Sequence, residues 1–121
     1  MPQVDTPGVL GERLARLTGT AASCCLPEYA SVASSIRRSR GFTDSLRRLK
    51  ALSDENRLLA AALLRRRGEL CACEIQAATG LTHATVSHHM GVLVDAGLVE
   101  VRRQGKWMYY RLKENADQVL P

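Results

Sequence analysis

The chain has 121 residues, enough for one domain with its own core, and its aromatic content of only 4% favours helices packed through Leu, Val and Ala. Basic residues outnumber acidic ones by 17 to 12, and this formal net charge of +5 favours a polyanionic partner. No apolar run reaches the roughly 18 residues of a membrane span and no secretory signal pattern opens the chain, which argues against a membrane-spanning or secreted protein.

The first 40 residues form a segment apart. Pro, Gly, Ser, Thr and Ala are frequent in it, and it carries the adjacent cysteines Cys24 and Cys25. We expect a cytoplasmic protein, in which the four cysteines of the sequence are thiols or metal ligands rather than structural disulfides. The sequence therefore predicts an N-terminal extension over residues 1–40 and a main domain over residues 41–121.

Two helices are predicted at the start of the main domain. The first has apolar residues at spacings of four and three, as on one helix face: Phe42, Leu46, Leu49 and Leu52. Ser53 is expected to cap the second helix, and Gly68 to end it. The apolar face of this second helix is expected to contain Leu58, Leu59, Ala62 and Leu63.

A third, short helix is predicted from about Leu70 to Thr79, with Gly80 at its end. It would carry the other two cysteines, Cys71 and Cys73, near its start. Positions two apart on a regular helix diverge by about 200°, so both sulfurs could reach one ion only if the first turn were distorted. We therefore expect that loading a shared ion strains or unwinds the start of this helix.

A fourth helix and a β-hairpin complete the main domain. Thr82 can cap the helix and Gly97 can end it. Its buried stripe is expected to consist of Val86, Met90, Leu93 and Val94. Alternating apolar residues then predict two strands joined by a turn at Gln104–Gly105, and the last residues offer at most a short final helix.

This order of elements predicts a mainly α fold with a β-hairpin wing, that is, a winged helix-turn-helix. In such a fold the second helix of the motif enters the major groove of DNA, and the hairpin meets phosphates or the minor groove. The exposed helix face carries short or hydrogen-bonding side chains, and the hairpin carries basic ones. The candidate DNA-binding residues are Thr82, His83, Ala84, Thr85, Ser87, His88, Arg102, Arg103 and Lys106.

Two neighbouring patterns have simpler interpretations. Trp107, Tyr109 and Tyr110 are expected to serve the core and strand pairing rather than base stacking. His88 and His89 are consecutive on a helix and point about 100° apart, so they are poor joint ligands for a metal ion.

The run from about residue 46 to residue 112 closely resembles the ArsR/SmtB family of metal-sensing bacterial repressors, through the motifs "ELCACEI", "TVSHHMGVLVDAGLV" and "RRQGKWMYYRL". The resemblance implies a homodimeric winged-helix repressor that leaves its operator when a metal or metalloid binds. It also implies that N-terminal cysteines of one subunit complete a site formed by the Cys-x-Cys pair of the other. The family's alternative site on a C-terminal helix is expected to be missing, since "KENADQVLP" contains no histidine.

The candidate metal ligands are therefore Cys24, Cys25, Cys71 and Cys73. Thiolates suit soft ions, and a trigonal metalloid needs three of them whereas tetrahedral ions usually take four. Because two adjacent cysteines fit one tetrahedral ion poorly, we favour As(III) or Sb(III) as inducer, with Cd(II), Pb(II) or Zn(II) as the alternative.

Other functions stay open from the sequence. The same cysteines could form a redox switch, with a disulfide between the two clusters, or could hold a structural Zn(II) in a constitutive DNA-binding protein. An enzyme is not expected, because no carboxylate pair, phosphate-binding Gly loop or nucleophile–base motif is present.

Overall fold

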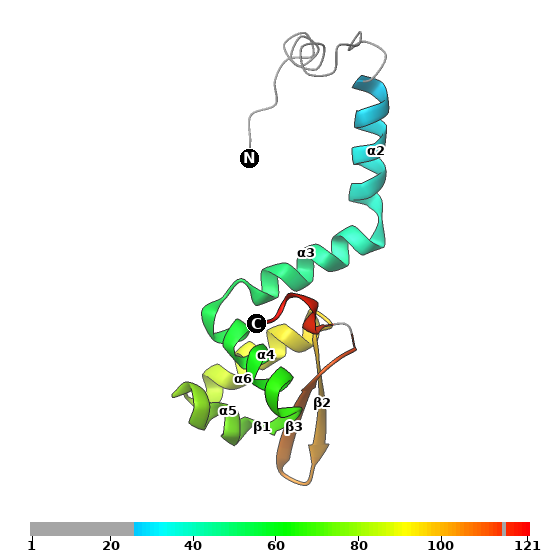
Figure 1. Cartoon of the computed structure of the whole chain (residues 1–121). Helices are drawn as coiled ribbons and strands as arrows, with labels where there is room; N and C mark the ends of the chain where they lie inside the picture. The colour runs from blue at the N-terminus through cyan, green and yellow to red at the C-terminus, as the bar shows by residue number, and fades with distance from the viewer. Residues whose placement is uncertain (1–25, 115) are drawn as a thin grey trace. The chain divides into compact units, whose positions relative to one another are not determined.

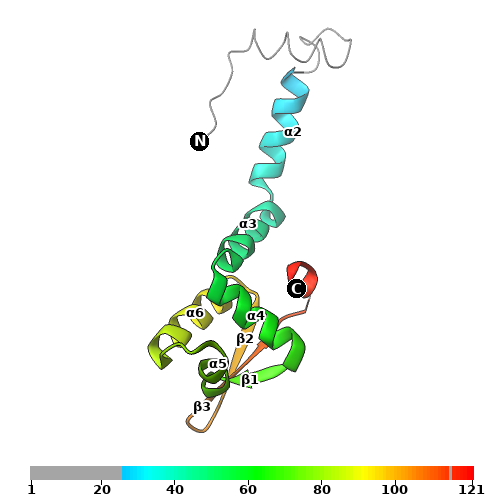
Figure 2. The same cartoon turned by 60° about the vertical axis from the view of Figure 1, so that its left-hand side comes forward.

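The computed structural model describes residues 26–114 and 116–121 (Figure 1). The chain divides into two compact units, Met1–Thr43 and Asp44–Pro121. In the second unit, helices gather beside a β-hairpin whose turn projects beyond them, as Figures 1 and 2 both show. Every helix in the described ranges is too short or too polar to span a lipid bilayer.

The first unit contains α2 (Leu26–Arg38) and the first turn of α3 (Arg40–Leu52). Ser39 separates the two helices. Its hydroxyl accepts a hydrogen bond from the Phe42 amide at 3.2 Å and donates one to the Ile36 carbonyl at 2.6 Å. Ser39 thus satisfies backbone groups at the end of one helix and at the start of the next.

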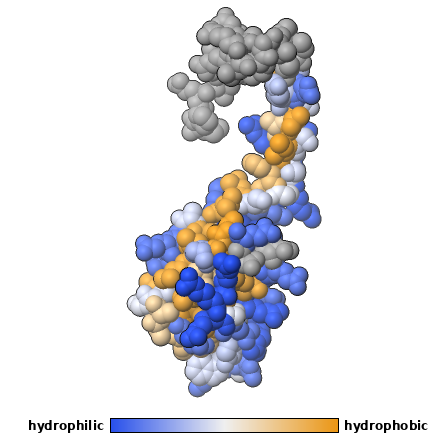
Figure 3. All heavy atoms as spheres, in the orientation of Figure 1, coloured by the Kyte–Doolittle hydropathy of each residue, from blue (hydrophilic) through white to orange (hydrophobic). Residues whose placement is uncertain are grey.

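Large apolar side chains on α2 and α3 are exposed, and Figure 3 shows apolar surface along both helices. They are Tyr29, Val32 and Ile36 on α2, and Phe42, Leu46 and Leu49 on α3. The helix predicted from the spacing of Phe42 to Leu52 is confirmed, but of its four predicted apolar positions only Leu52 is buried.

The next helix, α4 (Glu55–Arg67), is capped by Asp54, so the predicted Ser53 cap is wrong by one residue. The Asp54 carboxylate accepts hydrogen bonds from the amides of Asn56 and Arg57 at 2.9 and 3.1 Å. The bond from Arg57 is the main cause that lowers the pKa of Asp54. A carboxylate also complements the helix dipole, and the Ser53 hydroxyl instead donates to the Lys50 carbonyl at the end of α3.

The buried face of α4 also differs from the predicted one. Ala60, Ala61 and Leu64 are buried, whereas Leu59 is exposed and Leu58, Ala62 and Leu63 are half-buried. Residues 58–64 are all Leu or Ala, so the sequence does not mark which side faces the core. Burial of two alanines lets neighbouring helices approach α4 closely.

The segment predicted to start the third helix is a strand instead. β1 (Glu69–Cys71) pairs antiparallel with β3 (Trp107–Leu112), and α5 (Ala72–Thr79) begins only after it. Gly68, with a φ of 89°, ends α4, and residues 69–71 then follow the edge of β3. The partner strand lies some 40 residues further along the chain, so no local pattern reveals this pairing.

Thr82 caps α6 (His83–Asp95) as predicted, by accepting a hydrogen bond from the Thr85 amide at 3.3 Å. The predicted stripe is buried at Val86, Met90 and Leu93, while Val94 is half-buried. A 3-10 turn, η2 (Asp117–Val119), is the short final helix.

The hairpin consists of β2 (Val99–Gln104) and β3, and the sheet order is β1-β3-β2. Its two-residue turn is Gly105–Lys106, one residue later than predicted, because Gln104 pairs with Trp107. Tyr110 is buried as expected and Tyr109 is half-buried. Trp107 is 44% exposed, so it takes part in strand pairing but not in the core, and its predicted burial is wrong.

One apolar core joins α4, α5, α6 and the sheet within the second unit. Its most enclosed large side chains are Leu64, Ile75, Val86, Met90, Leu93 and Val99. No polar or charged side chain is buried among the described residues. Apolar packing in this core, together with the backbone pairing of β1 with β3, therefore fixes the relative positions of α5, α6 and the hairpin.

Truncation of Leu64 is expected to destabilise the protein far more than truncation of Leu59 on the same helix. Leu64→Ala leaves a cavity at a site that is 1% exposed and should cost about 2–5 kcal/mol. Leu59 is 42% exposed, and Leu59→Ala should cost less than about 1 kcal/mol. Urea unfolding followed by circular dichroism, at one protein concentration, measures both; equal losses would contradict this placement of α4.

Candidate nucleic-acid interface and thiol pair

The turn between α5 and α6 presents the start of α6 to solvent. Gly80, in the left-handed region with a φ of 73°, ends α5, and Thr82 begins α6 two residues later. The structure brings most of the predicted contact residues to one exposed surface, made of Thr82, His83, Ala84, Ser87 and His88, with Thr85 half-buried beside them. The Thr82 hydroxyl donates to the Thr85 hydroxyl at 2.9 Å, so these two side chains support each other at the helix N-terminus.

The two histidines of α6 have different surroundings. His88 is exposed, whereas His89 is half-buried and its Nδ1 lies 3.4 Å from a guanidinium nitrogen of Arg57. Their ring centroids are 5.7 Å apart and the rings are tilted by 54°. His88 is therefore available to an external partner, while His89 belongs to the contact between α4 and α6.

The three basic residues of the hairpin are not equivalent. Arg103 and Lys106 are exposed at and beside the turn. Arg102 donates from Nε and Nη2 to both carboxylate oxygens of Glu69, at 3.0 and 2.7 Å, and its hydrogen bond is the main cause that lowers the pKa of Glu69. Arg103 and Lys106 are thus the cations best placed for phosphates, and Arg102 is already engaged.

Sequence reasoning missed Glu69. Its role depends on β1, which the helical prediction for this segment concealed. Once β1 is a strand, alternation along the strand places Glu69 and Cys71 on the same face, and this is the signal that could have found the pair with Arg102.

Cys71 and Cys73 lie at the junction of β1 and α5. Cys71 is the N-cap of α5, with extended φ and ψ of −84° and 164°, and is half-buried; Cys73 is exposed in the first helical turn. The two thiols therefore do not share a regular helix as predicted, and strain at the start of α5 on ion binding stays a prediction. The Cys71 amide donates to the Glu74 carboxylate at 3.0 Å, and this bond is the main cause that lowers the pKa of Glu74.

The thiols suit a soft ion by donor chemistry, and two of them do not complete a site. The described residues contain no group of three or more Cys, His, Asp or Glu side chains that could hold a metal ion. Cys24 and Cys25 lie outside the described residues, so their part in a shared site stays a prediction.

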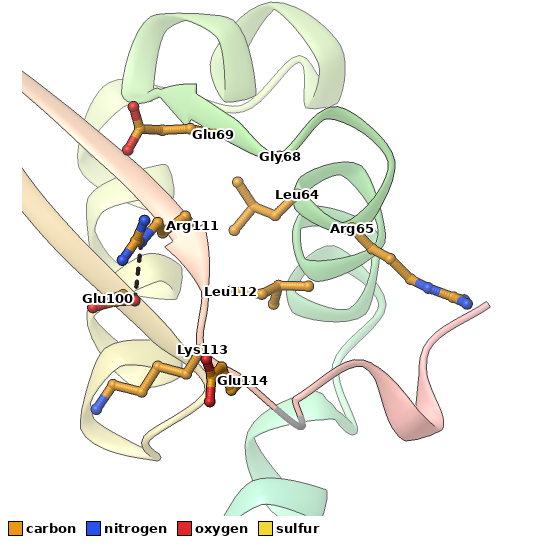
Figure 4. Close-up of a pocket in the computed structure, with 9 residues that line it drawn as sticks. All are labelled: Leu64, Arg65, Gly68, Glu69, Glu100, Arg111, Leu112, Lys113 and Glu114. Atoms are coloured by element: carbon orange, nitrogen blue, oxygen red, sulfur yellow. Dashed lines mark hydrogen bonds and ion pairs between the residues drawn. The ribbon is translucent and has the colours of Figure 1, made fainter.

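A pocket of about 940 Å³ lies between α4 and the sheet, and Figure 4 shows the side chains around it. It is lined by Leu64, Arg65, Gly68, Glu69, Glu100, Arg111, Leu112, Lys113 and Glu114. Its three basic and three acidic residues balance one another, and neither thiol lines it. This pocket therefore does not form part of the candidate interface.

Residues 54–101 match the family described as "Bacterial regulatory protein, arsR family". The chain is 41% identical over 69 residues to the arsenic resistance transcriptional regulator ArsR1 of Pseudomonas putida. The matched region covers 57% of this chain and 54% of the relative. It is 40% identical over 65 residues to a Staphylococcus aureus homolog of the cadmium resistance regulator CadC, with 54% of each chain covered. The chain thus spans about half the length of these curated relatives.

Among solved structures, the chain is similar to a DNA-binding domain from Mycobacterium bovis, described as a homodimeric winged helix-turn-helix and a possible ArsR-family transcriptional regulator. The TM-score is 0.57 at 37% identity, over 61% of this chain and 68% of that one. The predicted fold, mainly α with a β-hairpin wing, is confirmed as a winged helix-turn-helix, in which α5 and α6 form the helix-turn-helix and β2–β3 the wing.

Alkylation of the reduced protein is expected to reach Cys73 before Cys71. Cys73 is exposed, whereas Cys71 is half-buried where β1 pairs with β3. Iodoacetamide labelling quenched at short times, with tandem mass spectrometry to place each label, measures the order. Denatured protein is the control and should label both thiols at similar rates; faster labelling of Cys71 in the folded protein would contradict this geometry.

Proposed function

Because the chain belongs to the ArsR family of bacterial regulatory proteins, we propose that it is a repressor that binds operator DNA and is released when As(III) or Sb(III) binds its cysteine thiolates. The observation that carries this proposal is the position of the Cys71–Ala72–Cys73 run. It forms the end of β1 and the start of α5, the first helix of the helix-turn-helix. Ion binding there acts directly on the DNA-reading part of the fold.

DNA recognition is assigned to the exposed start of α6 and to the wing. Ser87 and His88 offer hydrogen bonds to base edges, and Ala84 allows close approach to the major groove. Thr82, His83 and Thr85 stand at the helix N-terminus, where hydroxyl, imidazole and amide groups suit phosphates. Arg103 and Lys106 reach backbone phosphates from the wing.

The active form is proposed to be a homodimer. Each of α2 and α3 exposes several large apolar side chains on one face, rather than a single isolated one. Exposed apolar patches of this kind mark surfaces that bind a partner. The similar Mycobacterium bovis domain is described as homodimeric. A second copy would cover these faces, and two recognition helices would then read two half-sites of one operator.

The inducer site is proposed to combine Cys71 and Cys73 with Cys24 or Cys25 from the N-terminal extension. Thiols must lose their protons to bind the ion, and a three-sulfur site is the set that a trigonal metalloid takes. The relative from Pseudomonas putida is named for arsenic resistance, which favours As(III) or Sb(III). The relative from Staphylococcus aureus is named for cadmium resistance, so Cd(II) at the same cysteines is the second candidate.

Cys71→Ser and Cys73→Ser are expected to keep operator binding and lose its release by the ion. Serine is itself a favoured N-cap residue, so Cys71→Ser should leave α5 intact. In the wild-type protein the ion should weaken DNA binding by about 5- to 150-fold, and in either variant by less than about twofold. Fluorescence anisotropy of operator DNA, titrated separately with arsenite, Cd(II), Pb(II) and Zn(II) under reducing conditions, measures the effect.

Cys24→Ser and Cys25→Ser, in the same titrations, identify which extension cysteine completes the site. Normal release from either the Cys71 or the Cys73 variant would refute the proposed thiolate site. Release by peroxide alone, without effect of any ion, would favour a redox switch instead.

Arg103→Ala and Lys106→Ala are expected to weaken binding similarly on operator and random DNA. Each should reduce the slope of log K against log salt by about one unit, if each meets one phosphate. Lys113→Ala is a matched control: Lys113 follows the far end of β3, about 20 Å from the turn at about 3.3 Å per residue, and its loss should leave the slope unchanged. A loss confined to particular bases would contradict phosphate contacts.

A further inference from the structure

An ion pair on the outer face of the sheet joins two strands that are not neighbours. Arg102 of β2 reaches across the central strand β3 to bind Glu69 of β1 through both carboxylate oxygens. On the way its guanidinium lies 4.6 Å from the ring centroid of Tyr109, on β3, and donates to the Gln104 side chain at 2.8 Å. Each of the three guanidinium nitrogens thus makes one hydrogen bond within the sheet.

The strand register places this pair next to the thiol pair. Cys71 is opposite Tyr109 in β3, and Tyr109 is opposite Arg102 in β2. Directly opposed residues in a sheet point to the same face, so Cys71, Tyr109 and Arg102 form one row across it. Glu69 precedes Cys71 by two residues and lies on the same face. The candidate ion ligand and the ion pair to the wing therefore share one three-residue strand.

We propose that Glu69 is a positioning residue: through Arg102, it transmits ion binding at Cys71 to the wing. This inference rests on the proposed function, in which Cys71 is a ligand. Displacement of the end of β1 by ion binding moves the Glu69 carboxylate, and the bidentate pair carries β2 with it. Arg103 and Lys106, the other basic residues of the wing, then leave the positions in which they fit DNA phosphates.

The geometry of the pair matters more here than its strength. Exposed ion pairs usually contribute little to stability, and these two side chains are 52% and 32% exposed. A bidentate pair nevertheless fixes direction as well as distance, and the Tyr109 ring beneath it limits where the guanidinium can lie. A contact can transmit no more coupling free energy than it contributes itself, so this pair is expected to carry a modest part of the response.

The sheet also offers a matched control. Glu100 of β2 and Arg111 of β3 form an ion pair of 2.9 Å, which Figure 4 shows. It joins strands that already exchange backbone hydrogen bonds. Arg111 is also opposite Glu69 in β1 and its charge helps to lower the pKa of Glu69, but Glu100 is not a partner in the Glu69–Arg102 hydrogen bonds. Glu100→Gln therefore removes one exposed carboxylate and one ion pair from the same face while it leaves the connection from Cys71 to the wing intact.

The test compares Glu69→Gln with Glu100→Gln and the wild-type protein. Arsenite and Cd(II) are added separately. Thiolate absorption measures ion affinity, and operator affinity is measured with and without ion. The third measurement is the fluorescence emission of Trp107, which lies in the wing and is the single tryptophan of the sequence. Glu69→Gln should bind the ion as the wild-type protein does. The ratio of operator affinities without and with ion should fall by about two- to fivefold, and the ion-induced change in Trp107 emission should decrease.

Glu100→Gln should match the wild-type protein in all three measurements. Equal coupling ratios and emission changes in Glu69→Gln and the wild-type protein would overturn the inference and leave the proposed function standing, with α5 as the path to α6. A wild-type protein whose operator binding ignores both ions would instead refute the proposed function, a failure visible before any variant is compared.

Discussion

The pairing of β1 with β3 is the contact on which the arrangement of the candidate site depends. Three residues form it, and at its centre Leu70 and Tyr110 are opposed and both buried, so the pairing is anchored in the core. This contact ends α4 at Gly68, makes Cys71 the N-cap of α5, and joins the hairpin to the helices. A helix over the same segment would leave β3 without its second partner and would carry Glu69 away from Arg102.

Strong local signals predicted most elements of the main domain. The Thr82 cap, three of the four stripe positions of α6 and the two strands of the hairpin each depend on residues close in sequence, and the structure bears them out. The errors arise where the deciding contact is distant or where neighbours compete. Asp54 displaces Ser53 as a cap because a carboxylate is the stronger acceptor at a helix N-terminus, and β1 needs a partner about 40 residues away. The exposed surface at the start of α6 followed from spacing, whereas the extension cysteines lie outside the described residues.

The hairpin illustrates what a charge count leaves out. The sequence presents Arg102, Arg103 and Lys106 as one basic group, and the structure separates them by what each already contacts. Arg102 already donates three of its five N–H groups to Glu69 and Gln104 and lies against the Tyr109 ring, which fixes its position. Arg103 and Lys106 are exposed beside the turn. We therefore prefer an account in which Arg103 and Lys106 contact phosphates and Arg102 fixes the position of the wing, over one in which all three are equal phosphate ligands.

Placement of the thiols at a strand–helix junction also changes how ion binding could act. Two cysteines within a regular helix could share an ion only by distorting that helix, and the response would then begin in α5 alone. At the junction, one thiol belongs to the end of a strand and the other to the first helical turn, so a shared ion would draw on both elements. The strand leads to the wing and the helix leads to α6, so an ion at this junction would act on both parts that are proposed to contact DNA. Because the two routes diverge at Cys71, a substitution in one of them should weaken the response without abolishing it.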